Sequence, residues 1–190
     1  VKTAADGIEL WRSDGTSANT FLLKDIYPGA ASSYPDRFFP YKNNLVFFAA
    51  TDAAHGNEIW TTDGTAAKTV LLKDINPGPD SSTYIPISLG LGFSYPFPLF
   101  SGFHIFNNRL FFMANDGVHG SAIWVTDGTT TNTSFLKVLA TDTTAFDFFS
   151  ILDAINLPGK FIFPYSNGTD RYELCQSDGT TNGTVLFKAF

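Results

Sequence analysis

The chain of 190 residues has a net charge of −6 and an isoelectric point near 4.8. This balance argues against a nucleic-acid partner, because phosphate binding needs clustered Lys and Arg. The 20 phenylalanines and a charged fraction of only 16% indicate a globular protein with a sizeable core. Prolines interrupt the most apolar stretch, 85–106, so we expect no membrane span. The sequence begins with Val1 and not with an initiator Met, and no signal-peptide pattern follows. We therefore expect this chain to be a processed or excerpted piece of a longer protein.

The first predicted unit covers residues 1–43. Its segments are the tail of a strand (1–6), "IELWRSDGT" (8–16), "TFLLKDI" (20–26) and "SYPDRFFPY" (33–41). Asp-Gly between two apolar runs predicts a hairpin, because Gly accepts the positive φ that the turn needs. The unit therefore reads as strands a, b and c, and the last segment can hold a fourth strand.

The second predicted unit, 44–107, repeats this order. Its segments are "NLVFFAATD" (44–52), "EIWTTDGT" (58–65) and "TVLLKDI" (69–75). A longer segment, 79–102, follows and carries five aromatic residues: Tyr84, Phe93, Tyr95, Phe97 and Phe100. Long loops are often functional and exposed apolar patches mark interfaces, so these rings are candidates for a ligand or partner surface. The alternative, that they cap an open end of the domain, stays open.

The third and fourth predicted units are 108–158 and 159–190. The third holds "RLFFMAND" (109–116), "AIWVTDGT" (122–129), "TSFLKVL" (133–139) and "TTAFDFFSIL" (143–152), and the fourth "GKFIFPYSN" (159–167), "ELCQSDGT" (173–180) and "TVLFKAF" (184–190). The apolar runs are rich in Phe, Val, Ile and Thr and lack a helical period, so we expect no long helix. Units of about 50 residues with four strands predict an all-β, propeller-like array of about four antiparallel units, open or incomplete.

The repeated motif resembles the bacterial ELWxxDGT repeat, whose fuller form continues to "KDIxPG". Copies one and two keep that tail as "KDIYPG" (24–29) and "KDINPG" (73–78), whereas copies three and four lose it. Ala122 replaces the Glu held by Glu9, Glu58 and Glu173, and Cys175 replaces the Trp. The resemblance implies a large secreted or cell-surface protein of propeller-like repeats with no established catalytic role.

The motif itself reads as a building block. Its repeated residues are the turn aspartates Asp14, Asp63, Asp127 and Asp178, and the mid-strand series Trp11, Trp60, Trp124 and Cys175. Catalytic groups must converge within hydrogen-bond reach, whereas copies about 50 residues apart belong to different units, so we expect each Asp to bond the N–H groups of its own turn. The Trp series is expected to fill the space between units, and sugar stacking by exposed rings is the alternative.

Two loops between strands a and b share an Asp-x-x-His spacing, Asp52 with His55 and Asp116 with His119. These four residues are weak metal candidates, since two ligands per loop fall short of a closed site, and a turn-forming role is preferred. No cofactor is expected, and calcium has no acidic loop of EF-hand type to support it. Aligning Asp6 with Asp52 matches Val1 to Phe47 and gives the first copy a shorter loop.

Three sequons, at Asn132, Asn167 and Asn182, fall in predicted turns and are candidate glycosylation sites. They are compatible with an extracellular location. The single Cys excludes an internal disulfide, so cysteine usage does not report the compartment.

The leading functional hypothesis is a non-enzymatic extracellular or cell-surface module for structure or adhesion. It would self-associate head to tail, or pair with neighbouring repeats, because 185–190 is expected to be an apolar edge strand of a unit that lacks a fourth strand. The alternative is a module that binds carbohydrate or another ligand through the 84–103 aromatics or loop tips. An enzyme is third, since no catalytic triad, glycosidase-like carboxylate pair or phosphate loop can be assembled.

Overall fold

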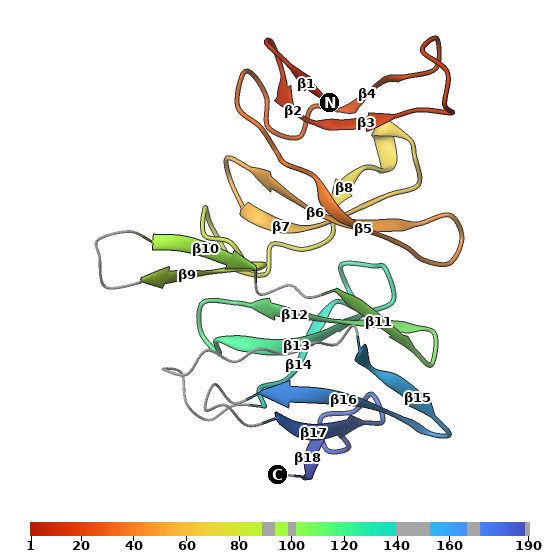
Figure 1. The fold of residues 1–190 in the computed structure, drawn as a ribbon, viewed down its shortest axis with the longest axis vertical. Helices are drawn as coiled ribbons and strands as arrows, with labels where there is room; N and C mark the ends of the chain where they lie inside the picture. Colours follow the sequence, from red (N-terminus) through yellow and green to blue (C-terminus); the bar gives the residue numbers. More distant parts are fainter. Residues whose placement is uncertain (89–93, 99–101, 140–152, 167–171, 189–190) are drawn as a thin grey trace. The chain divides into compact units, whose positions relative to one another are not determined.

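A computed structural model describes residues 1–88, 94–98, 102–139, 153–166 and 172–188, with backbone only for 84–98, 166 and 172. The chain divides into two compact units, Val1–Ser82 and Thr83–Phe190, and each is described by itself. Both consist of small antiparallel sheets (Figure 1), so the predicted all-β fold is confirmed. The described residues contain no long helix, and Ala66–Lys68 forms a single 3-10 turn.

Unit 1 contains two hairpins and a four-stranded sheet. The hairpins pair β1 (Lys2–Thr3) with β2 (Gly7–Ile8) and β3 (Leu10–Arg12) with β4 (Phe21–Lys24), and we call the two together the first sheet. The second has the order β5 (Asp36–Pro40), β6 (Val46–Asp52), β7 (Gly56–Thr62) and β8 (Val70–Leu71). This up-and-down order of four strands is that of a propeller blade.

Unit 2 contains a hairpin and two further sheets of the same order. The hairpin is β9 (Tyr84–Ser88) with β10 (Ser94–Pro98). The sheets are β11 (Phe103–Phe106), β12 (Arg109–Asn115), β13 (Ser121–Thr126) and β14 (Ser134–Lys137), then β15 (Ile155–Leu157), β16 (Lys160–Ser166), β17 (Tyr172–Ser177) and β18 (Val185–Lys188). Four-stranded sheets of the blade type thus recur in both units (Figure 1).

Within each unit, consecutive sheets pack against each other through apolar side chains. The cluster of unit 1 joins the first sheet to the second through Leu10, Leu23, Ile26, Phe48, Ala50 and Trp60. The cluster of unit 2 joins β11–β14 to β15–β18 and includes Phe111, Met113, Ile123, Leu136, Phe161, Phe163 and Cys175. Since successive residues of a strand face opposite sides, each strand offers alternate side chains to its two neighbouring layers.

The sheets are out of phase with the units predicted from the sequence. The predicted boundaries at 43/44, 107/108 and 158/159 fall in the hairpins that join β5 to β6, β11 to β12 and β15 to β16. The segment 36–40, expected to close the first unit, is instead the first strand of the second sheet. The signal was present in the Asn pairs 43–44 and 107–108, which adopt the two positive φ angles of a type I′ hairpin turn.

This phase also corrects the expectation for the C-terminal strand. β15 supplies the first strand of the last sheet, so the prediction that the fourth unit lacks a strand is wrong. β18 is the last strand of a complete sheet, as β8 and β14 are in theirs. Pairing of 185–190 with a strand of another chain stays a prediction. The segment 143–152, also expected to be a strand, lies outside the described residues.

Candidate functional site

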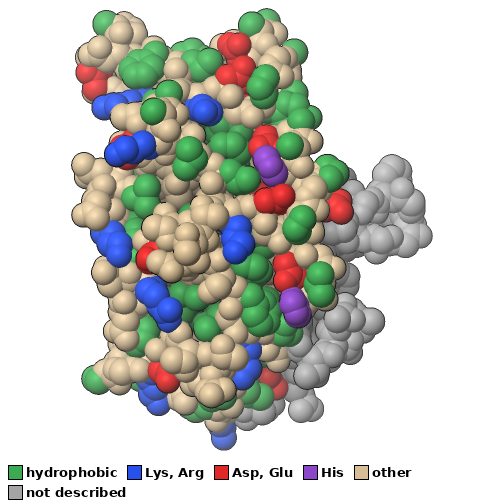
Figure 2. Space-filling view, turned by 180° about the vertical axis from the view of Figure 1, so that it is seen from behind, with side chains coloured by type: hydrophobic (Ala, Val, Ile, Leu, Met, Phe, Trp, Pro, Cys, Tyr) green, Lys and Arg blue, Asp and Glu red, His purple; other side chains and the backbone are tan. Residues whose placement is uncertain are grey.

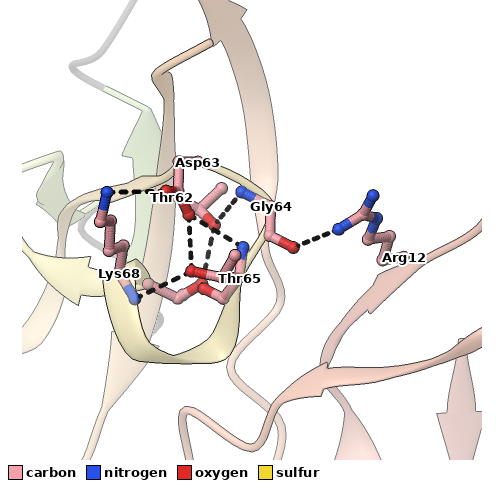
Figure 3. A network of polar contacts seen from close by, with 7 residues as sticks. Arg12, Thr62, Asp63, Gly64, Thr65 and Lys68 are labelled. Carbon is pink, nitrogen blue, oxygen red and sulfur yellow. Dashed lines mark hydrogen bonds and ion pairs between the residues drawn. The ribbon is translucent and has the colours of Figure 1, made fainter. Parts of the chain in front are cut away.

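The Asp-Gly-Thr turn of the second sheet joins β7 to β8 and is closed by Asp63 (Figure 3). Its Oδ1 accepts hydrogen bonds from the Thr65 N–H at 3.0 Å and the Thr65 hydroxyl at 2.7 Å, and Lys68 Nζ lies 3.2 Å from Oδ2. The Thr65 hydroxyl is the main cause that keeps the pKa of Asp63 below its ordinary value. The carboxylate is therefore occupied inside its own turn.

The other three turns repeat this geometry. In each, the Asp Oδ1 accepts from the N–H and hydroxyl of the Thr two residues later, at 2.6–3.0 Å; the pairs are Asp14 with Thr16, Asp127 with Thr129 and Asp178 with Thr180. The threonine hydroxyl again lowers the pKa of Asp14 and of Asp178. The four carboxylates thus belong to turns of four different sheets, each held by its own threonine.

Two hydroxyl groups bond across the hairpin behind each turn. Thr62 Oγ1 lies 2.7 Å from Thr69 Oγ1, and the Thr69 hydroxyl also donates to the Thr65 carbonyl at 2.8 Å. Thr69 has one proton and gives it to the carbonyl, so Thr62 is the donor within the pair, and its oxygen accepts the Gly64 N–H. The equivalent pairs are Ser13 with Thr20, Thr126 with Thr133 and Ser177 with Thr184. The structural motif is therefore Ser/Thr-Asp-Gly-Thr with a further Thr four residues later.

Thr69→Val is expected to lower the free energy of unfolding by about 1–3 kcal/mol, because it removes the acceptor of the Thr62 hydroxyl proton and the donor to the Thr65 carbonyl. Thr69 is fully buried, whereas the equivalent Thr20 lies in a solvent-exposed turn. Thr20→Val is the matched control and should cost less, since water can replace the lost bond. Urea unfolding of both variants measures the difference, and equal losses would contradict the role of the buried pair.

The repeated Trp positions occupy equivalent places in their sheets. The residues paired opposite them on the next strand are Leu22 for Trp11, Leu71 for Trp60, Phe135 for Trp124 and Leu186 for Cys175. Trp60, Trp124 and Cys175 are buried, and Trp11 is half-buried. Trp60 packs against the preceding sheet of unit 1. Buried rings cannot serve as sugar platforms, which need an exposed face.

The Asp-x-x-His segments are hairpin turns that close on themselves. Asp52 Oδ1 accepts the His55 N–H at 2.7 Å, and His55 Nδ1 lies 2.8 Å from Asp52 Oδ2. Asp116 and His119 make the same two contacts, both at 2.7 Å. Burial opposes ionisation of Asp116, but the N–H groups of His119 and Val118 and the His119 ring together outweigh it and lower the pKa of this carboxyl. Figure 2 shows histidine side chains beside acidic ones on the surface.

The first copy has the same turn with different residues. Thr3 Oγ1 donates to Asp6 Oδ2 and accepts the Asp6 N–H, both at 2.9 Å. Thr3 pairs with Gly7 as Asp52 pairs with Gly56, so Asp6 is equivalent to His55 and Val1 to Ala50. The alignment of Asp6 with Asp52 and the shorter first loop are therefore wrong. The reason is physical: several polar pairs three residues apart can close this turn, so shared Asp identity was misleading.

These turns do not assemble a ligand shell for a metal. Among the described residues, no three His, Cys, Asp or Glu side chains gather in one place. His55 and His119 each commit Nδ1 to the Asp of their own turn, which leaves one ring nitrogen per turn for a ligand. Zinc sites in proteins use three or four protein ligands, so each turn alone falls short.

Two buried glutamates of the repeated motif hold the segment that leaves each sheet. Glu9 accepts hydrogen bonds from the Ile26 N–H at 2.8 Å, the Ser33 N–H at 2.8 Å and the Ser33 hydroxyl at 2.6 Å. Glu58 accepts from the Asn76 N–H at 3.2 Å and the Ser82 hydroxyl at 2.5 Å. Both side chains are inaccessible to water, at 2% and 0% exposure. We call these contacts the glutamate clasps.

A pair of serines completes each clasp. The Ser32 and Ser81 hydroxyls accept the N–H groups of Ile8 and Asn57, the residues that precede the two glutamates. The Ser33 carbonyl also accepts the Thr51 N–H of β6, so the first clasp ties the first sheet of unit 1 to the second. Sequence reasoning missed the glutamates and serines as a set. Their signal was the Ser-Ser dipeptide that ends 24 residues after the Glu in both copies.

Close approach of the linker explains the glycine two residues before each clasping Glu. Gly56 has φ 65°, and a Cβ there would lie 2.6 Å from the Pro79 carbonyl oxygen. In the third copy no described residue lies within 4 Å of the equivalent position on Gly120, and Ala122 stands in place of the Glu. The third copy also lacks the "KDIxPG" tail.

Burial raises the pKa of Glu58 to about 8 from 4.5. The Ser82 hydroxyl and the N–H groups of Asn76 and Ile75 act in the opposite direction, and the nearby Asp74 carboxylate adds to the rise. The Glu58 carboxyl is therefore expected to be protonated near neutral pH.

Further polar contacts join consecutive sheets at the Asp-Gly-Thr turns. Arg12 Nη1 donates to the Gly64 carbonyl at 2.7 Å in unit 1 (Figure 3), and Arg109 Nη2 donates to the Gly179 carbonyl at 2.5 Å in unit 2. The glycine of the turn thus receives an arginine from the preceding sheet in both units. The residues of the repeated motif thus form their own turn and also make a contact with the preceding sheet.

The structure does not describe the side chains of the five aromatic residues that are candidates for a ligand surface. Phe93 and Phe100 lie outside the described residues, and Tyr84, Tyr95 and Phe97 are described by backbone alone, on β9 and β10. The sequon residues Asn132 and Asn182 are exposed, and Asn167 lies outside the described residues. Asn132 Nδ2 donates to Asp127 Oδ2 at 2.7 Å, as Asn19, which is in no sequon, does to Asp14 at 2.6 Å. The turn alone therefore accounts for Asn132.

Among the described residues, no helix is long and apolar enough to cross a membrane. No protein-family model matches the sequence, and no curated protein matches it. Among solved structures, a novel α-L-arabinofuranosidase from Clostridium thermocellum aligns over 84% of this chain, with 14% identity and a TM-score of 0.38. The chain spans about half of that enzyme, 52% of its length.

Proposed function

We propose that the chain is a non-enzymatic structural or adhesion module of the ELWxxDGT type, which acts outside the cell and assembles head to tail. One observation carries this proposal: the charged and polar residues of the repeated motif are bonded within the fold. The turn aspartates bind their own threonines, and the clasping glutamates bind the linkers. A repeated catalytic or ligand site would instead present these groups to a substrate.

The assembly part of the proposal rests on the repetition itself. Each unit joins two sheets through equivalent apolar positions and an equivalent arginine contact, so the surfaces that would receive a further sheet are built from equivalent residues. Contacts of this head-to-tail kind that do not close a ring generate filaments. The extracellular location rests on the sequence resemblance and on the exposed sequon residue Asn182.

Sedimentation velocity of the 190-residue chain over a range of concentrations, followed by electron microscopy, tests the proposal. A structural module should show growth of larger species with concentration and end-to-end particles. A strictly monomeric chain that binds a defined sugar on a glycan array would overturn it in favour of the ligand-binding alternative.

A further inference from the structure

The sheet–sheet contacts of the two units use the same positions. The outgoing face is formed by Leu10, Leu23 and Ile26 in unit 1 and by Ile123, Leu136 and Leu139 in unit 2. The incoming face of the sheet that follows is formed by Phe48, Ala50 and Trp60 in unit 1 and by Phe163, Tyr165 and Cys175 in unit 2. The strand register makes the two sets equivalent, because Phe48 pairs with Trp60 as Phe163 pairs with Cys175.

The outgoing face of the sheet β15–β18 is uncovered. Phe187 comes one residue after the strand partner of Cys175. Leu23 and Leu136 hold the same position, since each comes one residue after the strand partner of Trp11 or Trp124. Leu23 and Leu136 are 8% and 5% exposed, whereas Phe187 is 47% exposed. Leu174, equivalent to the buried Leu10 and Ile123, is half-buried. An aromatic ring thus stands in water where the other sheets bury a leucine.

The incoming face of the first sheet is uncovered in the same way. Val1 is equivalent to Ala50, and these residues are 66% and 0% exposed. Trp11 is half-buried, whereas its equivalent Trp60 is 7% exposed. Leu22, the partner of Trp11, is also half-buried. Among the described residues, the sheet β15–β18 therefore has an uncovered outgoing face and the first sheet an uncovered incoming face.

The polar contacts around the interface also have their counterparts. In unit 2, Lys137 Nζ donates to the Thr181 carbonyl at 3.2 Å, and the Thr181 hydroxyl donates to the Leu136 carbonyl at 3.2 Å. Lys188 holds the place of Lys137 on the last sheet, next to Phe187. On the first sheet the place of Thr181, three residues after the turn Asp, is held by the exposed Ser17, which has the required hydroxyl.

We propose that the outgoing face of β15–β18 (Leu174, Phe187 and Lys188) docks on the incoming face of the first sheet (Val1, Trp11, Leu22 and Ser17) of a second copy. The inference rests on the head-to-tail assembly of the proposed function and names its surfaces. The contact is one of packed side chains, repeating the interface inside each unit, and differs from strand addition along the edge of β18. It joins two different faces, so each added copy presents a new outgoing face.

Two single variants of the 190-residue chain test the polarity of this contact. Phe187→Glu places a negative charge on the outgoing face, and Leu22→Glu places one on the incoming face. Each should weaken self-association at least about tenfold by sedimentation, since a charge in the centre of an apolar contact is not paired. Val118→Glu is the control, because Val118 is 81% exposed at a turn tip. It should assemble as the parent chain does.

A mixture of the two variants gives the deciding result. Leu22→Glu keeps an intact outgoing face and Phe187→Glu an intact incoming face, so the mixture should form one-to-one dimers. The two remaining faces each carry an added glutamate and repel each other, so the dimers should grow no further. Assembly that neither substitution affects would overturn these surfaces and leave the proposed function standing. A parent chain that stays monomeric would overturn both. Circular dichroism and thermal melting confirm that each variant is folded.

Discussion

Replacing Trp60 by Ala is expected to lower the free energy of unfolding by about 3–5 kcal/mol, the usual loss for a buried aromatic ring. Trp60 is 7% exposed and packs with Leu10 and Leu23 between the two sheets of unit 1. Its removal opens a cavity at the contact that holds consecutive sheets together, and the surrounding strands can fill it only in part. Urea denaturation followed by circular dichroism measures the loss.

Two further variants separate the causes of this loss. Trp60→Phe should cost much less, because the indole N–H is buried without a hydrogen-bond partner among the described residues, and its removal relieves a polar cost. Trp11→Ala should also cost less, since Trp11 is only half-buried. If Trp11→Ala and Trp60→Ala were equally destabilising, the assignment of Trp60 to a closed interface and Trp11 to an open one would be wrong.

The proton held by Glu58 is expected to make stability depend on pH. The folded chain keeps this proton up to about pH 8, whereas the unfolded carboxyl loses it near its ordinary pKa of 4.5. The stability that it contributes is therefore fully present below about pH 4.5 and is lost as the pH rises through about 8. Linkage puts this contribution on the order of 5 kcal/mol.

Glu58→Gln is the variant that isolates this effect. Glutamine resembles the protonated acid in shape and can still accept the Asn76 N–H, so the variant should match the parent chain near pH 5 and exceed it near pH 9. The comparison matters because burial lowers the pKa of His104, which changes stability in the opposite direction as its imidazolium titrates. Asp80→Asn removes an exposed charge from the same linker and controls for net charge. Parallel pH profiles for parent and Glu58→Gln would contradict a buried proton at this site.

The sequence by itself determined the features that depend on neighbours a few residues apart. The all-β character, the repeated hairpins and the binding of each turn Asp within its own turn follow from contacts between residues such as Asp63 and Thr65. These interactions close within a single turn of chain, where the choice of partner is narrow. A local motif therefore predicts its own geometry.

Only the tertiary structure decided which distant segments meet. Segment 36–40 belongs to the second sheet because a hairpin places it beside β6. The boundary between sheets therefore differs from the unit boundary predicted from the repeat. Glu9 and Ser33 meet across 24 residues because the linker folds back over Gly7, whose absent side chain admits it. The exposure of Phe187 beside its buried equivalent Leu136 depends on what covers each sheet. The physical reason is common to all three: burial and long-range hydrogen bonds are properties of packed layers, and the residue pattern of one strand does not specify the layer above it.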